Sequence, residues 1–290
     1  LRHGEMTGRM LELFESYLLE NKTDYVLVYG DTNSTLAGML AAIKLGIPVA
    51  HVEAGLRSYN MKMPEEINRI LVDRLSTLLF CPTEQAVKNL AKEGLKNGIH
   101  QTGDVMLDVA LYYKEKAKQK SNILIDHNLN PDEYFLVTCH RAENTDDPIR
   151  LNQILSALAE IASTTKVIFP IHPRTRKYII QADMMHHLKD ILVVEPLAFL
   201  DMILLEQFAK GIITDSGGVQ KEAFFYDVPC ITMRDETEWV ETVESGWNTI
   251  TGADKQKILE AASSLKKGIA DFSPYGDGNA SENILNIIKG

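Results

Sequence analysis

Four acidic side chains near the start of the sequence are of the type and spacing that suit proton transfer. Asp31 and Glu53 each follow an apolar run, at the ends of two strands that are expected to be adjacent, and Glu65 and Glu66 stand at the start of a helical pattern. Carboxylates that lie close together push one another's pKa values apart, so one site can hold both an acid and a base near neutral pH. Plainer interpretations exist: Asp31 as a helix cap, and Glu65 as a first-turn acid favoured by the helix dipole.

A glycine-rich turn in the second half of the chain has the form of a phosphate-binding site. In TDSGGVQKEAFF, a predicted strand gives way to Ser216, Gly217 and Gly218, and a helix follows. Glycines let the backbone approach a ligand, and the free N–H groups at a helix start favour an anion such as a diphosphate. Glu222, about one turn into the helix, can accept from sugar hydroxyls. An N-capped helix after a tight turn would look similar, and the pattern is neither a Walker loop nor GxGxxG.

Further polar residues stand where other predicted strands end. Taken singly, each of them is expected to be a cap or a turn residue. In an open parallel sheet, however, ligands bind beyond the carboxyl ends of the strands, so several such residues together predict a shared site. They are His51 and Arg57 on either side of Glu53, the pair His140 and Arg141, His172, and Asp215.

The elements that must position these residues alternate between strand and helix along the whole chain. Apolar runs rich in β-branched residues, separated by helical patterns, indicate a parallel sheet covered on both faces. The fold class is therefore predicted as α/β, with two Rossmann-like doubly wound domains facing a cleft. The clearest predicted strands are 25–31, 47–53, 134–140, 166–172, 191–195, 211–215 and 230–233, and the clearest helices are 34–46 and 64–79.

A polar, lysine-rich stretch divides this alternation into two blocks. The stretch KEKAKQKSN, residues 114–122, is the best candidate for a boundary or linker. The predicted domains are an N-terminal Rossmann-like domain over 1–120 and a C-terminal Rossmann-like domain over 121–277. The last segment, 278–290, is predicted as a helix that packs back on the first domain.

Composition excludes several classes of function. A net charge of −10 and a pI near 5.3 argue against a nucleic-acid surface, which needs clustered Lys and Arg. No apolar run approaches the roughly 18 residues of a membrane span. The three cysteines form no CxxC and cannot all pair, which favours a reducing cytosol. No metal motif is found, because His186 and His187 are adjacent and HExxH is absent, and no GxSxG elbow supports a Ser-His-Asp site.

Taken in order, the motifs resemble one known family. YGDTNSTLAG, HVEAGLRS, MPEEINR, LLFCPT, TGDVMLD, HRAEN, PIHPR, TDSGGVQKEA and MRDETEWVET look like those of the non-hydrolysing UDP-N-acetylglucosamine 2-epimerases, from about residue 4 to the end. The resemblance implies the GT-B architecture and interconversion of UDP-GlcNAc and UDP-ManNAc for cell-surface polysaccharide precursors. It also implies a cytoplasmic homodimer that binds a UDP-sugar without a further cofactor.

The resemblance also implies roles for individual residues. The family removes the proton at sugar carbon 2, eliminates UDP to leave a 2-acetamidoglucal, and adds UDP back after reprotonation on the other face. Which carboxylate serves as the base stays open. Asp31, Glu53 and Glu65 match the acid/base carboxylates, and His140 matches the histidine that assists departure of the diphosphate. The nucleotide contacts are matched by Ser216, Gly217 and Gly218 for the phosphate, Glu222 for the ribose, His172 for a position near UDP, and Arg234 for a cation beside the diphosphate. Arg57 and Arg141 are supporting candidates.

One departure from the family and several alternatives accompany this prediction. The family begins with a strand and a GTRPE loop, and neither occurs here, so the first domain is expected to lack its opening strands. SYNMKMPEE and GDVMLDVALYY also resemble 2-epimerases that act on UDP-2,3-diacetamido-2,3-dideoxy-glucuronate. A catalytically inactive UDP-sugar binding module is a further alternative. A GT-B glycosyltransferase would leave the carboxylate set unexplained.

Overall fold

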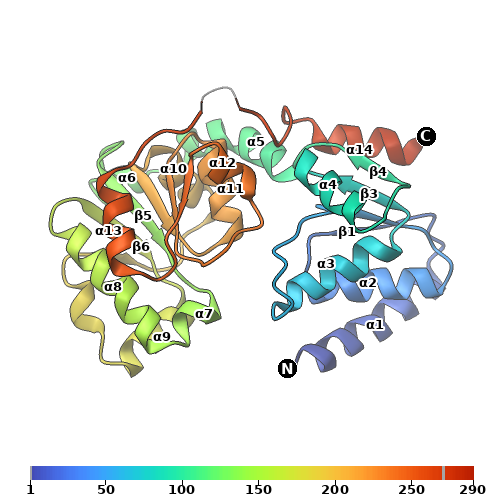
Figure 1. Cartoon of the computed structure of the whole chain (residues 1–290), viewed down its shortest axis with the longest axis horizontal. Helices are drawn as coiled ribbons and strands as arrows, with labels where there is room; N and C mark the ends of the chain where they lie inside the picture. The colour runs from blue at the N-terminus through green and yellow to red at the C-terminus, as the bar shows by residue number, and fades with distance from the viewer. Residues whose placement is uncertain (1, 270–271) are drawn as a thin grey trace. The chain divides into compact units, whose positions relative to one another are not determined.

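The computed structural model describes residues 2–269 and 272–290 and divides into two compact units (Figure 1). The first unit contains residues 1–108 and 273–290, and the second contains residues 109–272. Each unit is built around one parallel sheet. The predicted α/β class with two Rossmann-like domains is confirmed.

The first unit holds a four-stranded parallel sheet whose order, β1-β2-β3-β4, follows the chain. The strands are short and mostly buried, as expected where helices cover both faces. The elements are α1 (His3–Glu20), β1 (Val26–Tyr29), α2 (Asn33–Lys44), β2 (Val49–Val52), α3 (Pro64–Leu75), β3 (Leu78–Cys81), α4 (Glu84–Lys92), β4 (Ile99–Gln101) and, from the end of the chain, α14 (Ala280–Lys289).

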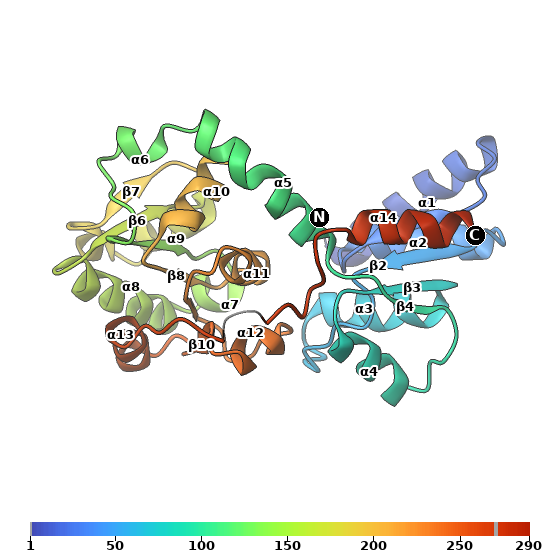
Figure 2. The same cartoon turned by 90° about the horizontal axis from the view of Figure 1, so that it is seen from above.

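Residues far apart in sequence cover the two faces of this sheet. On one face Val28 and Val49 pack with Met39 of α2 and Val72 of α3. On the other face Ile284 of α14 packs against Val52 and Phe80. Figure 2 shows α14, coloured red, running beside these early strands. The last helix of the chain therefore completes the core of the first unit.

The second unit holds a six-stranded parallel sheet in the order β10-β9-β8-β5-β6-β7. Strand order reverses at β5, which pairs with β6 on one side and with β8 on the other. Ligands bind at such a switch point in doubly wound sheets. The strands are β5 (Tyr134–Thr138), β6 (Lys166–Pro170), β7 (Leu192–Val194), β8 (Gly211–Thr214), β9 (Cys230–Thr232) and β10 (Asn248–Ile250).

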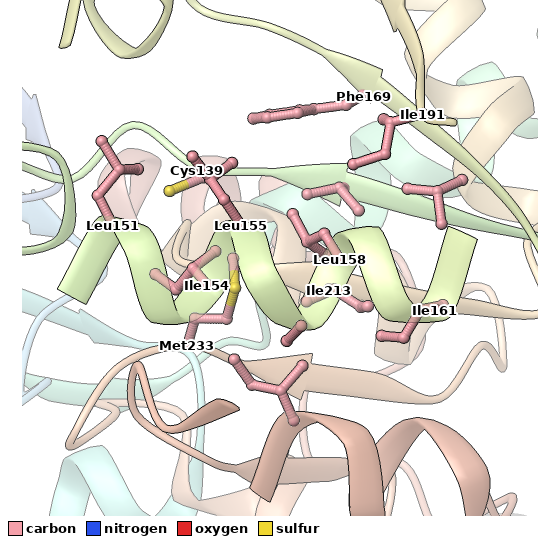
Figure 3. Packing of buried hydrophobic residues seen from close by; sticks show 14 of the residues in the cluster. Cys139, Leu151, Ile154, Leu155, Leu158, Ile161, Phe169, Ile191, Ile213 and Met233 are labelled. Atoms are coloured by element: carbon pink, nitrogen blue, oxygen red, sulfur yellow. The ribbon is translucent and has the colours of Figure 1, made fainter. Parts of the chain in front are cut away.

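Helices cover both faces of the second sheet. On one face Leu151, Ile154 and Leu158 pack against Phe169 and Ile213 of the strands (Figure 3). On the other face the Tyr134 hydroxyl donates to the Leu205 carbonyl at 2.7 Å. The helices are α6 (Ile123–Asp126), α7 (Ala142–Thr145), α8 (Pro148–Ala162), α9 (Pro173–Gln181), the 3-10 turn η1 (Met185–Leu188), α10 (Phe199–Phe208), α11 (Gly217–Phe225), α12 (Val240–Glu244) and α13 (Lys255–Ser263).

Two parts of the fold differ from the sequence-based expectation. The lysine-rich stretch forms the C-terminal half of a helix, α5 (Val105–Lys120), within which one unit gives way to the next. Its exposed polar side chains are those of a solvated helix, and they resemble a linker only in composition. The strands β4 and β10 were not predicted, because their sequences, IHQ and NTI, are not the apolar runs that mark the equally short β7 and β9.

Candidate active site

Asp31 and Glu53 lie at adjacent strand ends in the first unit. Strands β1 and β2 pair in parallel with Tyr29 opposite Val52, so both carboxylates follow at the same edge of the sheet. This adjacency was predicted, and it is confirmed. The Glu53 carboxylate lies over Gly30: a Cβ added at Gly30 would stand 3.3 Å from Oε2 of Glu53.

Asp31 is held by contacts with α3 and does not cap α2. Its carboxylate accepts from Arg69 at 2.6 Å, and its backbone carbonyl accepts from the Asn68 amide at 2.8 Å. The cap of α2 is Thr32, whose hydroxyl forms a capping box with Thr35. The interpretation of Asp31 as the cap is therefore wrong, and its carboxylate is left for another task.

The neighbours Glu65 and Glu66 at the start of α3 have different surroundings. Glu66 is fully buried and accepts from the backbone N–H groups of Ser58 and Tyr59 at 3.0 and 2.9 Å, and from Arg69 at 2.9 Å. It fixes the loop after β2 to the helix. Glu65 is half-buried and makes no hydrogen bond or ion pair with the described residues. It precedes Arg69 by four positions, so it shares the helix face that meets Asp31.

Glu53 has an unusual backbone conformation for a residue with a side chain. Its φ is +70°, in the left-handed region. That region costs an L-residue about 1–2 kcal/mol relative to ordinary backbone, and such residues persist where surrounding contacts hold them. Strained residues of this kind gather at functional sites, which marks Glu53 as a candidate on grounds independent of its sequence motif.

Arg57 and Gly55 are packed into the interior. The Arg57 guanidinium donates to Asp73 at 2.7 Å and to both oxygens of Glu93 at 2.7 and 2.8 Å. Gly55 is required by packing, since a Cβ there would stand 2.4 Å from the Ala86 carbonyl oxygen. The structure therefore places Arg57 and Gly55 in the packing of α3 and α4 behind the Glu53 loop.

In the second unit, candidate residues follow the two strands at the switch point. His140 lies two positions after the end of β5, and Ser216 lies two positions after the end of β8. Between them Asp215 is fully buried and accepts from the backbone N–H groups of His140 and Arg141 at about 3.0 Å and from the Asn144 amide at 3.2 Å. Asp215 thus ties the two strand ends together.

His140 and His172 present imidazole rings at neighbouring strand ends. Their ring centroids are 6.2 Å apart, and the His140 side chain is 41% exposed. Burial lowers the pKa of His140 below its ordinary value of 6.5, and the charges of Arg141 and His172 lower it further, against the raising effect of Asp215. His172 accepts from the Arg174 backbone N–H through Nδ1 at 3.2 Å, so its Nε2 is left to donate.

The glycine-rich turn keeps its hydroxyl available. Ser216 stands at the N-cap position of α11, but its side chain makes no cap hydrogen bond. Its backbone N–H is taken by Thr214 Oγ1 at 2.9 Å. A Cβ at Gly217 would lie 2.8 Å from a Glu238 oxygen, so a larger residue there would require the Glu238 side chain to shift. Gly218 is half-buried in the first turn of α11.

The two candidate arginines of the second unit differ in exposure. Arg234 is 2% exposed and pairs with Glu238 at 3.0 Å, with Glu143 at 3.7 Å on its other side. The Arg141 side chain is half-buried and makes no hydrogen bond or ion pair with residues 2–269 and 272–290. Of the two, Arg141 has the guanidinium that is open to an anion.

Glu222 belongs to a buried acidic cluster that the sequence analysis missed. Burial raises the pKa of Glu222, against the lowering effect of Lys221. Burial, with the Glu222 charge, raises the pKa of Glu206 well above its ordinary value. One Glu206 oxygen and the Tyr226 hydroxyl are buried without a hydrogen-bond partner among the described residues. Glu206 was missed because nothing in its apolar helix marks it as facing Glu222.

The described residues contain no group of three or more His, Cys, Asp or Glu that could hold a metal ion. All three cysteines are buried and free. No helix in residues 2–269 and 272–290 combines the length and the apolar character that a membrane crossing requires.

Comparison with known proteins decides the family. The family model described as UDP-N-acetylglucosamine 2-epimerase matches residues 1–289. The chain belongs to the UDP-N-acetylglucosamine 2-epimerase family. The predicted family and the predicted class, an epimerase and hence an isomerase, are confirmed.

Individual relatives within the UDP-N-acetylglucosamine 2-epimerase family carry two kinds of name. The chain is 51% identical to a UDP-2,3-diacetamido-2,3-dideoxy-D-glucuronate 2-epimerase of Pseudomonas aeruginosa, covering 99% of this chain and 80% of the relative. It is 49% identical to a UDP-N-acetylglucosamine 2-epimerase homolog of Methanococcus maripaludis, covering 99% and 81%.

A solved structure from the same family is very similar to the whole chain. The UDP-GlcNAc 2-epimerase of Methanocaldococcus jannaschii, in complex with UDP-GlcNAc and UDP, is 45% identical with a TM-score of 0.93. The match covers 100% of this chain and 82% of the solved one. The predicted GT-B-like fold class is confirmed by this similarity.

Proposed function

We propose that this epimerase inverts carbon 2 of a UDP-N-acetylhexosamine, converting UDP-GlcNAc to UDP-ManNAc. The observation that carries the proposal is the gathering of Asp31, Glu53 and the Glu65 helix face at one sheet edge, within a chain of the epimerase family. Inversion at carbon 2 requires a proton to leave one face of the sugar and another to arrive on the opposite face. More than one carboxylate is suited to that task.

In the proposed reaction a carboxylate takes the carbon 2 proton while the bond between carbon 1 and the diphosphate oxygen breaks. UDP leaves with the electron pair, and a 2-acetamidoglucal remains. A second acidic group then protonates carbon 2 from the other face, and UDP adds back to carbon 1. Asp31, Glu53 and Glu65 are the proposed proton-transfer residues, and the assignment of each to one face stays open.

The second unit is proposed to hold the UDP. Ser216 offers an uncommitted hydroxyl, and the start of α11 offers backbone N–H groups for the diphosphate. Arg141 is a cation open to the same group, and Gly217, Gly218 and Arg234 shape and neutralise the turn around it. Glu222 is proposed to accept from the ribose. His140 is proposed to assist the departing diphosphate and His172 to lie near UDP.

A second substrate is favoured by one comparison. The Pseudomonas aeruginosa relative, at 51% identity, is named for UDP-2,3-diacetamido-2,3-dideoxy-D-glucuronate, whereas the solved Methanocaldococcus jannaschii structure contains UDP-GlcNAc. Both substrates carry an acetamido group at carbon 2 and would undergo the same inversion. The diacetamido-glucuronate adds a carboxylate that requires a cation.

Exchange of the carbon 2 hydrogen tests the proposal. The protein is incubated in deuterated water with UDP-GlcNAc or with the diacetamido-glucuronate, without an acceptor, and the sugar is followed by NMR. We expect deuterium at carbon 2 and the inverted sugar with UDP-GlcNAc. Exchange with only the uronate would identify the second substrate. UDP binding without exchange on either sugar would contradict the proposal and indicate an inactive binding module.

The homodimer and the cytoplasmic location implied by the family resemblance stay predictions. The same holds for the role in polysaccharide precursor synthesis and for the functional domain boundaries 1–120 with 278–290, and 121–277. Light scattering on the purified protein would measure the oligomeric state directly.

A further inference from the structure

Asp73 of α3 contacts the residues on both sides of Glu53. Its Oδ1 lies 2.6 Å from Nδ1 of His51, two positions before Glu53. Its Oδ2 accepts from the backbone N–H of Gly55, two positions after Glu53, at 3.1 Å. The buried Asp73 carboxylate thus binds the chain on both sides of Glu53, the residue with the strained backbone.

The backbone around Glu53 is fixed by further contacts that depend on the same arrangement. His51 Nε2 lies 2.8 Å from the Gly30 carbonyl, and the Gly30 N–H donates to the Val52 carbonyl at 3.0 Å. Glu53 keeps a φ of +70° between these anchored neighbours. The Glu53 carboxylate lies over Gly30. Gly30 therefore contacts both the His51 ring, through its carbonyl, and Oε2 of Glu53.

The Asp73 carboxylate is paired with a buried cation. Asp73 is fully buried and also accepts from Arg57 at 2.7 Å, and Arg57 pairs with Glu93. Burial alone would raise the pKa of Asp73, but the hydrogen bonds and charges of His51 and Arg57 bring it below its ordinary value. Oxygen atoms of Asp73 and Gly30 thus hold the His51 ring through both of its nitrogens.

We propose that Asp73 is a positioning residue for Glu53: by holding His51 and Gly55, it keeps Glu53 in its left-handed conformation with the carboxylate over Gly30. No group of Asp73 reaches the substrate in this proposal, since its side chain is 0% exposed. The inference rests on the proposed role of Glu53 in proton transfer. It predicts that Asp73 affects the reaction through Glu53 and not through nucleotide binding.

A double-mutant cycle with Asp73→Asn, Glu53→Gln and the pair tests this coupling. The rate measured is carbon 2 hydrogen exchange at saturating sugar nucleotide, together with the Kd for UDP. We expect Asp73→Asn alone to lower the rate by about 10- to 100-fold, as for a misplaced catalytic group. In the Glu53→Gln background the same change should have an effect of about 2-fold or less, with the Kd for UDP unchanged in every variant.

Glu93→Gln is the matched control. It removes a charge from the far side of Arg57 and leaves the contacts of Asp73 with His51 and Gly55 in place. This variant should lose thermal stability but keep its exchange rate. Equal fractional losses from Asp73→Asn in both backgrounds, or an equal rate loss in Glu93→Gln, would overturn the proposal.

His51→Gln covers the case in which Asp73→Asn does not fold, because it removes one of the two anchors and keeps a polar side chain. Its rate loss should likewise vanish in the Glu53→Gln background. If neither variant folds, the carboxylate is a folding element and the positioning role is rejected. If the parent protein shows no exchange at all, the proposed function fails, and that outcome is distinct from additivity in an active enzyme.

Discussion

Arg69 lies one helical turn after Glu65 on α3, and its guanidinium is 2.6 Å from the Asp31 carboxylate. A second nitrogen of the same group lies 2.9 Å from Glu66, which anchors the loop after β2. The planar guanidinium of Arg69 therefore fixes the position of Asp31 relative to the loop after β2. Glu53, the other candidate proton-transfer residue at this sheet edge, stands where that loop leaves the strand. A lysine has the charge but not the fork that holds two carboxylates at once.

Arg69→Lys is therefore expected to reduce the rate of carbon 2 exchange by up to about 100-fold with little change in KM, because Asp31 loses its orientation. Steady-state exchange kinetics measure both values. Arg9→Lys is the control, since Arg9 forms an exposed pair with Glu5 on α1 and should be neutral. An Arg69→Lys enzyme with an unchanged rate would show that the ion pair does not orient Asp31.

His140 and Ser216 should affect different steps. His140→Ala is expected to lose turnover far more than UDP affinity, since the proposed role of the ring is in departure of the diphosphate. Ser216→Ala is expected to raise the Kd for UDP by about 10-fold, the usual effect of a lost hydrogen bond to a charged group. Calorimetry gives the affinities and NMR exchange gives the rates. Equal losses of turnover and affinity in His140→Ala would reduce His140 to a binding residue.

Gly55 and Gly46 allow the effect of close packing to be separated from that of backbone strain. Both have positive φ, +82° and +73°, but a Cβ at Gly55 meets the Ala86 carbonyl at 2.4 Å, whereas nothing lies within 4 Å of one at Gly46. Gly46→Ala should cost about 1 kcal/mol of unfolding free energy. Gly55→Ala should cost about 2–4 kcal/mol, since overpacking adds to the strain. Urea denaturation measures both, and equal costs would refute the packing argument.

Glu206→Gln should stabilise the protein in a pH-dependent way. The folded-state pKa of Glu206 is raised above 4.5 by burial and by Glu222, so above that pH the unfolded chain releases a proton that the native state retains. Native stability therefore falls as pH rises from 4.5 toward the folded pKa, and the glutamine variant is free of that loss.

The Tm advantage of Glu206→Gln should accordingly grow as the pH rises above 4.5 and reach a few degrees. Differential scanning calorimetry at several pH values measures it. The exposed Glu12→Gln on α1 serves as the control and should show no such trend. A constant difference across the pH range would mean that Glu206 does not titrate as described.

Polar residues at the ends of predicted strands identified much of the candidate site. The other residues were placed by the way helices are rotated against the sheet. Asp31, Glu53, His140 and Ser216 were found because apolar runs that end in polar residues are visible in a sequence. Asp73 could not be found that way: it lies in the last turn of an amphipathic helix, and its contacts with His51 and Gly55 depend on how α3 is rotated against the sheet.

The residues around the site show the same division between what sequence reveals and what packing decides. Arg57 was selected as a possible supporting cation because it follows Glu53 by four positions. Its pairing with Glu93 depends on where α4 packs, which no local pattern encodes. The left-handed backbone of Glu53 was equally hidden, since a positive φ is expected from glycine and asparagine, and only rarely from glutamate.

The return of α14 to the first unit has a consequence for biosynthesis. Val52 and Phe80 pack against Ile284 of α14, a helix that is made after the whole of the second unit. At bacterial and eukaryotic translation rates, the intervening stretch takes roughly ten to thirty seconds to synthesise. During that time the apolar face of the nascent first sheet lacks its covering helix, and it is the surface that a chaperone would be expected to shield on the ribosome.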